Sequence, residues 1–312
     1  MCDDDAFDDM VAYRLRLALC SRRGFASWSL GAASLLAAGC RPAEQAATPS
    51  PTAPSASAPT EDAGIALDET EVRIPTPDGT CDAHFVHPKA GAAPGVLVWP
   101  DIFGLRPAFR DMGRRLARSG YAVLTVNPFY RTQPAPTSSP NARFDDPKTR
   151  EALMALSRSL TPETQLADAK ALTAWLDQQP AVDRSKKLGT TGYCMGGPIV
   201  FRTAAAIPER VGAAATFHGG GLVTDKPESP HLLVPKMKAQ LLVAVASNDD
   251  AKQPTAKDTL KAAFAEASLT AKVEVYEGAL HGWCPPDSHV YARESAERAW
   301  SELLALFARA LA

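Results

Sequence analysis

From about residue 65 to the end, short runs of apolar and β-branched residues alternate with stretches whose apolar residues recur at helical spacing. The runs predict strands over 71–75, 81–87, 95–99, 121–126, 187–191, 211–217, 240–246 and 273–276. The stretches predict helices over about 107–119, 163–179, 195–206, 255–267 and 289–311. Strands that alternate with helices build parallel βαβ units. We therefore expect one α/β domain over residues 65–312, with a mostly parallel twisted sheet and helices on both faces.

The first 39 residues have a different pattern, which is typical of an export signal. Residues 21–25 have the sequence SRRGF and precede a weakly apolar stretch, 26–39, that ends in small residues. The arginine pair resembles a twin-arginine signal, and the small residues before Cys40 resemble the cleavage box of bacterial lipoproteins. We expect residues 1–39 to be removed and Cys40 to carry lipid. An ordinary amphipathic first helix is the alternative, although the stretch has no helical period.

Residues 40–64 consist mainly of Pro, Ala, Ser and Thr, with few charges. Such a composition cannot bury enough apolar surface to fold, so we expect a disordered tether between anchor and domain. The protein is then expected in the periplasm or cell envelope, with the lipid on Cys40 as its only contact with the membrane. The aspartates among residues 3–9 are an unusual preface to an export signal, so translation need not begin at Met1.

Composition and charge exclude several classes of protein. Of the 312 residues, 46% are hydrophobic and 22% are charged, which excludes a fibrous or wholly disordered chain. The 33 Lys and Arg face 35 Asp and Glu, so no positive excess exists to hold a phosphate backbone, and nucleic acid is not an expected partner. No apolar run reaches 18 residues, so no transmembrane helix is predicted. Six cysteines are too few for a disulfide scaffold in a chain of this length.

A candidate nucleophile stands where the strand over 187–191 meets the following helix. The junction has the sequence GYCMGG, with Cys194 at the tip of the turn. Glycines two residues before and after a nucleophile are typical of the strained elbow GxSxG, and here cysteine replaces serine. The N-terminus of the helix favours thiolate over thiol, because its positive dipole end and free N–H groups stabilise the anion. The alternative is a buried cysteine that acts as a small hydrophobic residue.

With this elbow the sequence resembles the dienelactone hydrolase family, which has a cysteine nucleophile in a GxCxGG turn. Four further stretches agree: WPDIFGL over 99–105, NPFYR over 127–131, an acidic pair after the strand 240–246, and the tripeptide HGW over 281–283. The resemblance covers about 70–312 in order. It implies the α/β-hydrolase fold and hydrolysis of a carboxylic ester or lactone. Nucleophile, acid and histidine follow one another in the order found in α/β-hydrolases.

The same resemblance points to the base and the acid of a catalytic triad. His281 lies in a loop directly after the last parallel strand, where an imidazole can reach the elbow. Either Asp249 or Asp250 could orient that imidazole. Aligning Ala246 with the small residue that ends this strand in the family selects Asp249, whereas counting back from Pro254 selects Asp250. We predict Asp249, with the alternative that one or both aspartates cap the next helix.

The resemblance also implies an oxyanion hole and substrate contacts. The backbone N–H groups of Ile102 and Met195 are the expected oxyanion donors. Asp101 stands where the family has a glutamate that holds the resting thiol, so it is a candidate substrate-site residue or a residue that structures the turn. Arg131 lies one residue out of register with a family arginine that binds a substrate carboxylate. A solvated surface arginine is the alternative.

Other polar residues leave alternatives open. His218 follows a strand and either lines the pocket or is a hydrogen-bonded core histidine. Cys81 and Cys284 could pair in an exported domain, although nothing in the sequence places them within disulfide reach. A zinc site from Cys194, Cys284 and His281 has no supporting CxxC or HxxxH spacing, so we expect neither a metal nor a cofactor.

These observations predict a Cys-His-Asp hydrolase that acts through an acyl-cysteine intermediate on a small ester or lactone. The family's namesake substrate, a dienelactone, belongs to the catabolism of aromatic compounds, and a cell-envelope location is unexpected for such a step. We therefore expect the substrate to be another ester, a lactone or a thioester. One alternative is an envelope-anchored binding protein that keeps the fold without catalysis. Another is a redox thiol at Cys194 that cycles through sulfenic acid. The sequence does not determine the oligomeric state.

Overall fold

The computed structural model describes residues 65–312. The predicted export signal, the lipid on Cys40 and the predicted tether over 40–64 lie outside the described residues.

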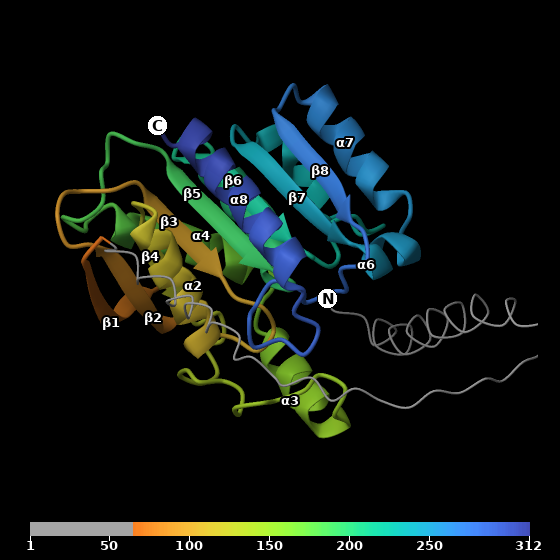
Figure 1. The fold of residues 1–312 in the computed structure, drawn as a ribbon, viewed down its shortest axis with the longest axis horizontal. Helices are drawn as coiled ribbons and strands as arrows, with labels where there is room; N and C mark the ends of the chain where they lie inside the picture. The colour runs from red at the N-terminus through yellow and green to blue at the C-terminus, as the bar shows by residue number, and fades with distance from the viewer. Residues whose placement is uncertain (1–64) are drawn as a thin grey trace, which may run out of the picture. The chain divides into compact units, whose positions relative to one another are not determined.

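Eight strands of the described chain form one sheet in the order β1-β2-β4-β3-β5-β6-β7-β8 (Figure 1). The strands are β1 (Leu67–Thr76), β2 (Gly79–Pro88), β3 (Gly95–Trp99), β4 (Ala122–Val126), β5 (Leu188–Tyr193), β6 (Val211–Phe217), β7 (Gln240–Ala246) and β8 (Ala271–Tyr276). The first two strands pair antiparallel with each other, and β2 pairs antiparallel with β4. All other neighbours are parallel. The mostly parallel sheet predicted from the alternation of strands and helices is therefore confirmed.

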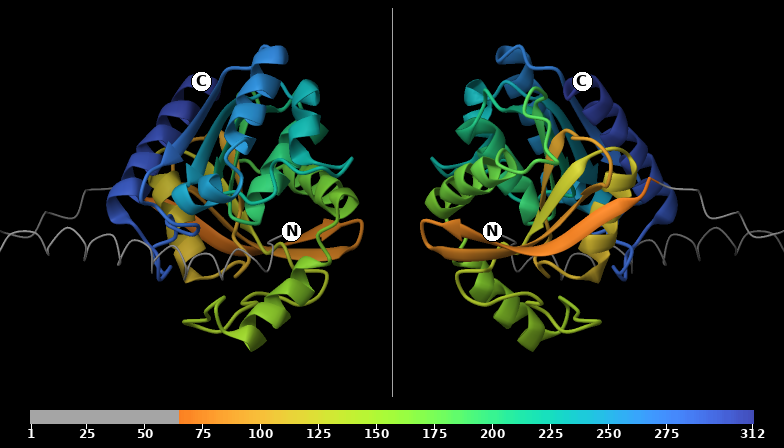
Figure 2. Two further views of the ribbon diagram at one scale, coloured as in Figure 1. Left: turned by 90° about the vertical axis from the view of Figure 1, so that its right-hand side faces the viewer. Right: turned by 90° about the vertical axis from the view of Figure 1, so that its left-hand side faces the viewer.

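Helices cover both faces of this sheet. They are α2 (Pro107–Arg118), α3 (Pro147–Ser157), α4 (Pro162–Leu176), α5 (Gly196–Ala206), α6 (Ser247–Lys252), α7 (Ala256–Glu266) and α8 (Arg293–Ala310), with a 3-10 helix η1 (Pro230–Lys236). The apolar sides of α2 and α8 share one core cluster, and those of α4, α5 and α7 share another. Helix α3 stands apart from the helices that cover the sheet (Figure 2).

The strand β3 shows why the centre of the sheet is apolar on both sides. All five of its residues are buried. Val96 and Val98 belong to the cluster under α2 and α8, whereas Leu97 and Trp99 belong to the cluster under α4 and α5. Successive side chains of a strand point to opposite faces, and a parallel sheet covered on both faces needs apolar residues at every position.

Three local features differ from the prediction. Helix α8 begins at Arg293 rather than near 289, because the preceding residues belong to the loop that carries His281. The short helix α6 follows β7 directly and contains both candidate aspartates. Helix α3 was not predicted, and it buries only Leu153 and Leu156, so its apolar pattern is weak.

Among residues 65–312, no helix is both long and apolar enough to span a bilayer.

The packing of α8 gives a test of the fold. Leu303 is fully buried in the cluster between α8 and the sheet. Leu303→Ala should lower the free energy of unfolding by about 2–5 kcal/mol, since it removes apolar contacts and leaves a cavity. The measurement is urea unfolding, with Ser301→Ala at an exposed position of the same helix as the control. Equal unfolding energies for the two variants would contradict this packing.

Candidate active site

The turn between β5 and α5 places Cys194 in a strained conformation. Its φ is 51°, in the left-handed region that non-glycine residues seldom adopt. Cys194 is 7% exposed. A Cβ added to Gly192 would lie 2.4 Å from the Gly196 carbonyl oxygen, and one added to Gly196 would lie 2.3 Å from the Trp99 carbonyl oxygen. Both flanking glycines are therefore required by close backbone contacts, which is the reason for the GxCxG spacing.

His281 and Asp249 form a hydrogen-bonded pair. The distance between His281 Nδ1 and Asp249 Oδ2 is 2.6 Å. The His281 backbone N–H donates to Asn248 Oδ1 at 2.8 Å, which holds the loop after β8 against α6. Asp250 instead accepts a hydrogen bond from Lys257 Nζ at 2.6 Å. Asp249 and Asp250 are neighbours in one helical turn, so their side chains point in different directions and only Asp249 contacts the imidazole.

One large pocket, of about 1880 Å³, holds Cys194, His281 and Asp249 in its wall. These residues follow β5, β8 and β7, so the pocket opens at the carboxyl ends of the parallel strands, where ligands bind in open α/β sheets. Segments far apart in sequence complete the wall. They include Asp101, Ile102, Met195, Met154 of α3, Gln165 of α4 and Arg202 of α5.

Two backbone donors are available beside Cys194. Ile102 and Met195 both line the pocket. Within residues 65–312, their N–H groups donate to no backbone or side-chain oxygen. Buried or partly buried N–H groups normally have a partner, so two such groups on residues of the pocket wall are suited to receive an anionic oxygen of a bound ligand.

Asp101 is engaged in the turn after β3. Its carboxylate accepts the Phe103 N–H at 2.9 Å and two guanidinium bonds from Arg106, at 2.7 and 2.9 Å. Arg106 also donates to Asp287, at 2.7 and 3.0 Å. Burial alone would lower the pKa of Arg106, but these carboxylates, Asp101 first, raise it above its ordinary value. The structure therefore supports the turn-forming alternative for Asp101.

Arg106 escaped the sequence analysis because its partner Asp287 lies 181 positions away in the chain. Through its two carboxylates it ties the turn that carries Ile102 to the loop that carries His281. No local motif marks that role.

Arg131 does not line the pocket. Its guanidinium donates to both oxygens of Asp168, at 2.7 and 2.8 Å, and to Asp78 at 2.6 Å. Tyr130 donates its hydroxyl to the same Asp168 at 2.7 Å. The expectation of a substrate contact at Arg131 is thus not retained, and the arginine is neither solvated nor free, because two carboxylates neutralise it.

His218 is a core residue beside the imidazole of His281. Its ring is almost fully buried, and within the described chain neither ring nitrogen has a hydrogen-bond partner. The ring centroid lies 5.1 Å from that of His281 and 5.0 Å from that of Trp283. His218 therefore neither lines the pocket nor is hydrogen-bonded through its ring, in contrast to both alternatives. Burial first, and then His281, holds the pKa of His218 well below its ordinary value.

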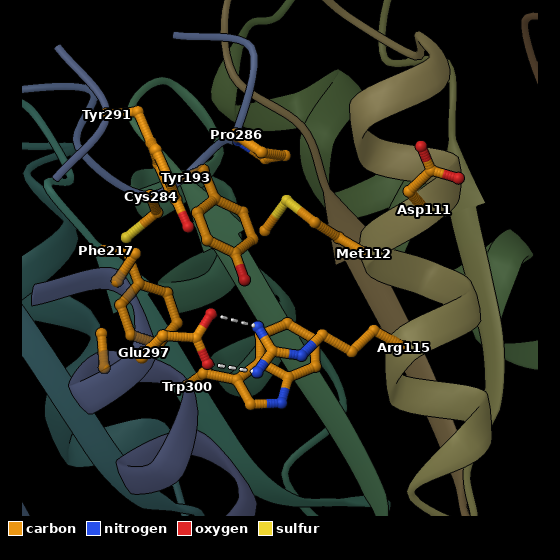
Figure 3. A pocket seen from close by; sticks show the side chains of 12 residues that line it. Asp111, Met112, Arg115, Tyr193, Phe217, Cys284, Pro286, Tyr291, Glu297 and Trp300 are labelled. Atoms are coloured by element: carbon orange, nitrogen blue, oxygen red, sulfur yellow. Dashed lines mark hydrogen bonds and ion pairs between the residues drawn. The ribbon is translucent and has the colours of Figure 1, made fainter. Parts of the chain in front are cut away.

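Cys81, Cys194 and Cys284 form no disulfide bond within residues 65–312. Cys81 and Cys284 belong to the core clusters on opposite faces of the sheet, so a disulfide between them is excluded. Burial raises the pKa of both thiols. Cys284 lines a smaller cavity of about 140 Å³ between α2 and α8 (Figure 3). No group of three His, Cys, Asp or Glu among residues 65–312 could hold a metal ion.

Comparisons with known proteins agree with this geometry. The model of the "Dienelactone hydrolase family" matches residues 81–311. A Salmonella typhi protein named "Putative carboxymethylenebutenolidase" is 30% identical over 243 residues, which cover 76% of this chain and 85% of that protein. A Synechocystis protein of the same name is 28% identical over 78% of this chain and 97% of its own. The crystal structure of a "Putative Dienelactone Hydrolase" from Klebsiella pneumoniae superposes with a TM-score of 0.66 at 26% identity, over 78% and 99% of the two chains. The shared architecture is the α/β-hydrolase fold.

The burial of His218 predicts an acid-sensitive contribution to stability. The folded state holds His218 neutral, whereas the unfolded state binds a proton below its ordinary pKa of about 6.5. Stability from this residue is therefore complete above pH 6.5 and falls as the pH decreases. Between pH 7.5 and 5.5, the wild type should lose about 1.4 kcal/mol more unfolding free energy than His218→Phe, which keeps a ring but has no proton to bind. Denaturant titrations at the two pH values measure this, and equal losses would contradict it.

Proposed function

The chain belongs to the dienelactone hydrolase family, and we propose that it hydrolyses a carboxylic ester or lactone with Cys194, His281 and Asp249 as its catalytic triad. Family membership indicates a hydrolase with a small-molecule substrate. The observation that supports the triad is the 2.6 Å bond between His281 and Asp249 in the wall of the pocket that also holds Cys194.

In the first half-reaction, the Cys194 thiol gives its proton to His281, and the thiolate attacks the carbonyl carbon of the substrate. The carbonyl oxygen becomes an oxyanion that accepts the N–H groups of Ile102 and Met195. Asp249 holds the imidazole through Nδ1 and stabilises its charged form. The imidazolium then protonates the leaving alkoxide, the C–O bond breaks, and an acyl-cysteine remains.

In the second half-reaction, His281 takes a proton from a water molecule, and the resulting hydroxide attacks the thioester carbonyl. The same two N–H groups hold the second oxyanion. Collapse of this intermediate breaks the C–S bond and releases the carboxylic acid, while the sulfur recovers its proton from the imidazolium. The strained φ of Cys194 and the ion pairs of Arg106 support such a site, because both keep the reacting groups in place before substrate arrives.

The size of the pocket bears on the substrate. A volume of about 1880 Å³ exceeds the several hundred to about 1000 Å³ typical of small-molecule sites. We propose that the acyl or alcohol part extends beyond the reacting group toward α3, α4 and α5, which complete the wall.

Two matched variants test the triad. Asp249→Asn should lower kcat by about 10²- to 10⁴-fold on a chromogenic ester, because the imidazole loses the carboxylate that holds its tautomer and charge. Asp250→Asn should stay within about threefold of the wild type, because Asp250 contacts Lys257 and not His281.

Cys194→Ala should abolish turnover, and the wild type should be alkylated by iodoacetamide at Cys194 faster than a free cysteine near neutral pH. Full turnover by Cys194→Ala would refute the cysteine mechanism, and equal losses for the two aspartate variants would refute the assignment of the acid.

We also propose that the protein is exported and that Cys40 carries lipid. Cells that express the full chain should hold it in the membrane fraction, whereas Cys40→Ala should release it to the soluble part of the envelope, since a lipid chain is then missing. Fractionation with radiolabelled palmitate measures both. Unlabelled wild type in the soluble fraction would contradict this proposal without affecting the triad.

A further inference from the structure

Arg202 is the one buried cation among residues 65–312. It lies on α5, eight positions after Cys194, and is 7% exposed. Its side chain lines the pocket that holds Cys194 and His281. No motif of the sequence analysis pointed to this residue.

The guanidinium of Arg202 is held by neutral oxygens. Its Nη1 donates to Gln165 Oε1 at 3.2 Å and to the Pro198 carbonyl at 3.4 Å, and its Nη2 donates to the Glu228 carbonyl at 3.0 Å. Within the described chain it has no carboxylate at ion-pair distance. A guanidinium has five N–H donors, so three bonds leave two donors without a protein acceptor.

Arg202 differs from Arg106 and Arg131 in the partners of its guanidinium group. Those two arginines pair with carboxylates, which raise their pKa values against burial. Burial lowers the pKa of Arg202, and the more distant carboxylates of Glu228 and Glu163 only partly oppose it. A buried charge without a counter-ion is destabilising by several kcal/mol. An anion bound in the pocket would supply the counter-charge that the protein does not.

We propose that Arg202 is a substrate-binding residue that receives an anionic group, a carboxylate or a phosphate, at the end of the acyl chain. This inference rests on the proposed ester hydrolysis at Cys194. The bound anion supplies the charge that Gln165 and the two carbonyl oxygens do not, and it takes the two remaining N–H donors in a fork geometry. Arg202 thereby selects charged over neutral esters.

The helix fixes the reach of this subsite. Eight residues of an α-helix rise about 12 Å. Helical side chains lean toward the N-terminus, and the bond from Nη1 to Pro198, one turn earlier, shows that the Arg202 guanidinium does so. The charge therefore lies roughly 6 Å along the helix from the level of Cys194. An acyl chain with about three to five atoms between the scissile carbonyl and the anion spans that distance.

The test compares three esters of equal length on the full protein. They are mono-4-nitrophenyl glutarate, its neutral methyl ester, and 4-nitrophenyl 4-phosphonobutanoate. In Arg202→Met, the ratio of kcat/KM for a charged ester to that for the neutral ester should fall by about 10- to 100-fold, mostly through KM, as expected for loss of a charge-assisted hydrogen bond. The control is Arg143→Met, which removes a pocket-lining arginine already paired with Asp145 at 2.5 Å and should keep the wild-type ratio. The ester that shows the larger fall identifies a carboxylate or a phosphate as the anion.

A binding measurement separates this inference from the proposed function. Calorimetry on the Cys194→Ala protein should detect glutarate or 4-phosphonobutanoate, and the added Arg202→Met or Arg202→Gln should weaken binding by about tenfold or more. Arg202→Gln serves if the methionine variant fails to fold, because glutamine can still bond the surrounding oxygens. Unchanged ester ratios together with unchanged anion binding would overturn the subsite while the triad stands. Turnover of all three esters by Cys194→Ala would overturn the proposed function, and binding of the anions would still report on Arg202.

Discussion

The close backbone contact between the start of α5 and the end of β3 is the constraint on which the site depends. Gly196 meets the carbonyl oxygens of Trp99 and Pro100 so closely that no Cβ fits. The chain must turn sharply there, and the turn holds Cys194 at a φ of 51° next to the first residues of the helix. The adjacent parallel strands β3 and β5 thereby bring the residues that follow them, Ile102 and Met195, into the wall of the same pocket as Cys194. A bulkier residue at 196 would push the start of α5, and with it Cys194 and Met195, away from the end of β3.

Ion pairs between distant segments complete this frame. Arg106 joins the turn after β3 to the loop before α8, and the His281 backbone is held by Asn248 at the start of α6. Each contact links loops at the carboxyl edge of the sheet, which the strands position but do not fix. The loop that carries His281 is thus anchored on two sides, and the Asp249 carboxylate meets Nδ1 of its imidazole at 2.6 Å.

Buried and half-buried cationic groups of the described chain differ in how their charge is balanced. Carboxylates neutralise Arg106 and Arg131, and the pairs they form tie one part of the chain to another. Arg202 keeps neutral partners in the pocket wall. His218 shows the complementary case, in which burial keeps an imidazole uncharged beside the proposed base. Burial therefore has different effects on the two residues. His218 is kept neutral, whereas Arg202 keeps its charge without a carboxylate partner in the described chain.

Local patterns in the amino-acid sequence were sufficient to predict several features of the fold. Alternating apolar runs and helical stretches predicted the strands and their parallel order, and the spacing of glycines around Cys194 predicted the elbow, because a strand, a sharp turn and a helix each impose their own period or residue type. The resemblance to the dienelactone hydrolase family then pointed to His281, after the last strand, and to the pair Asp249 and Asp250. Contacts in the folded chain were needed to show that Asp249 bonds the imidazole, that Asp101 and Arg131 pair with other charged groups, and that Arg202 lines the pocket. Those outcomes depend on which side chains from distant segments come within a few ångströms of each other, and neither periodicity nor spacing along a chain carries that information.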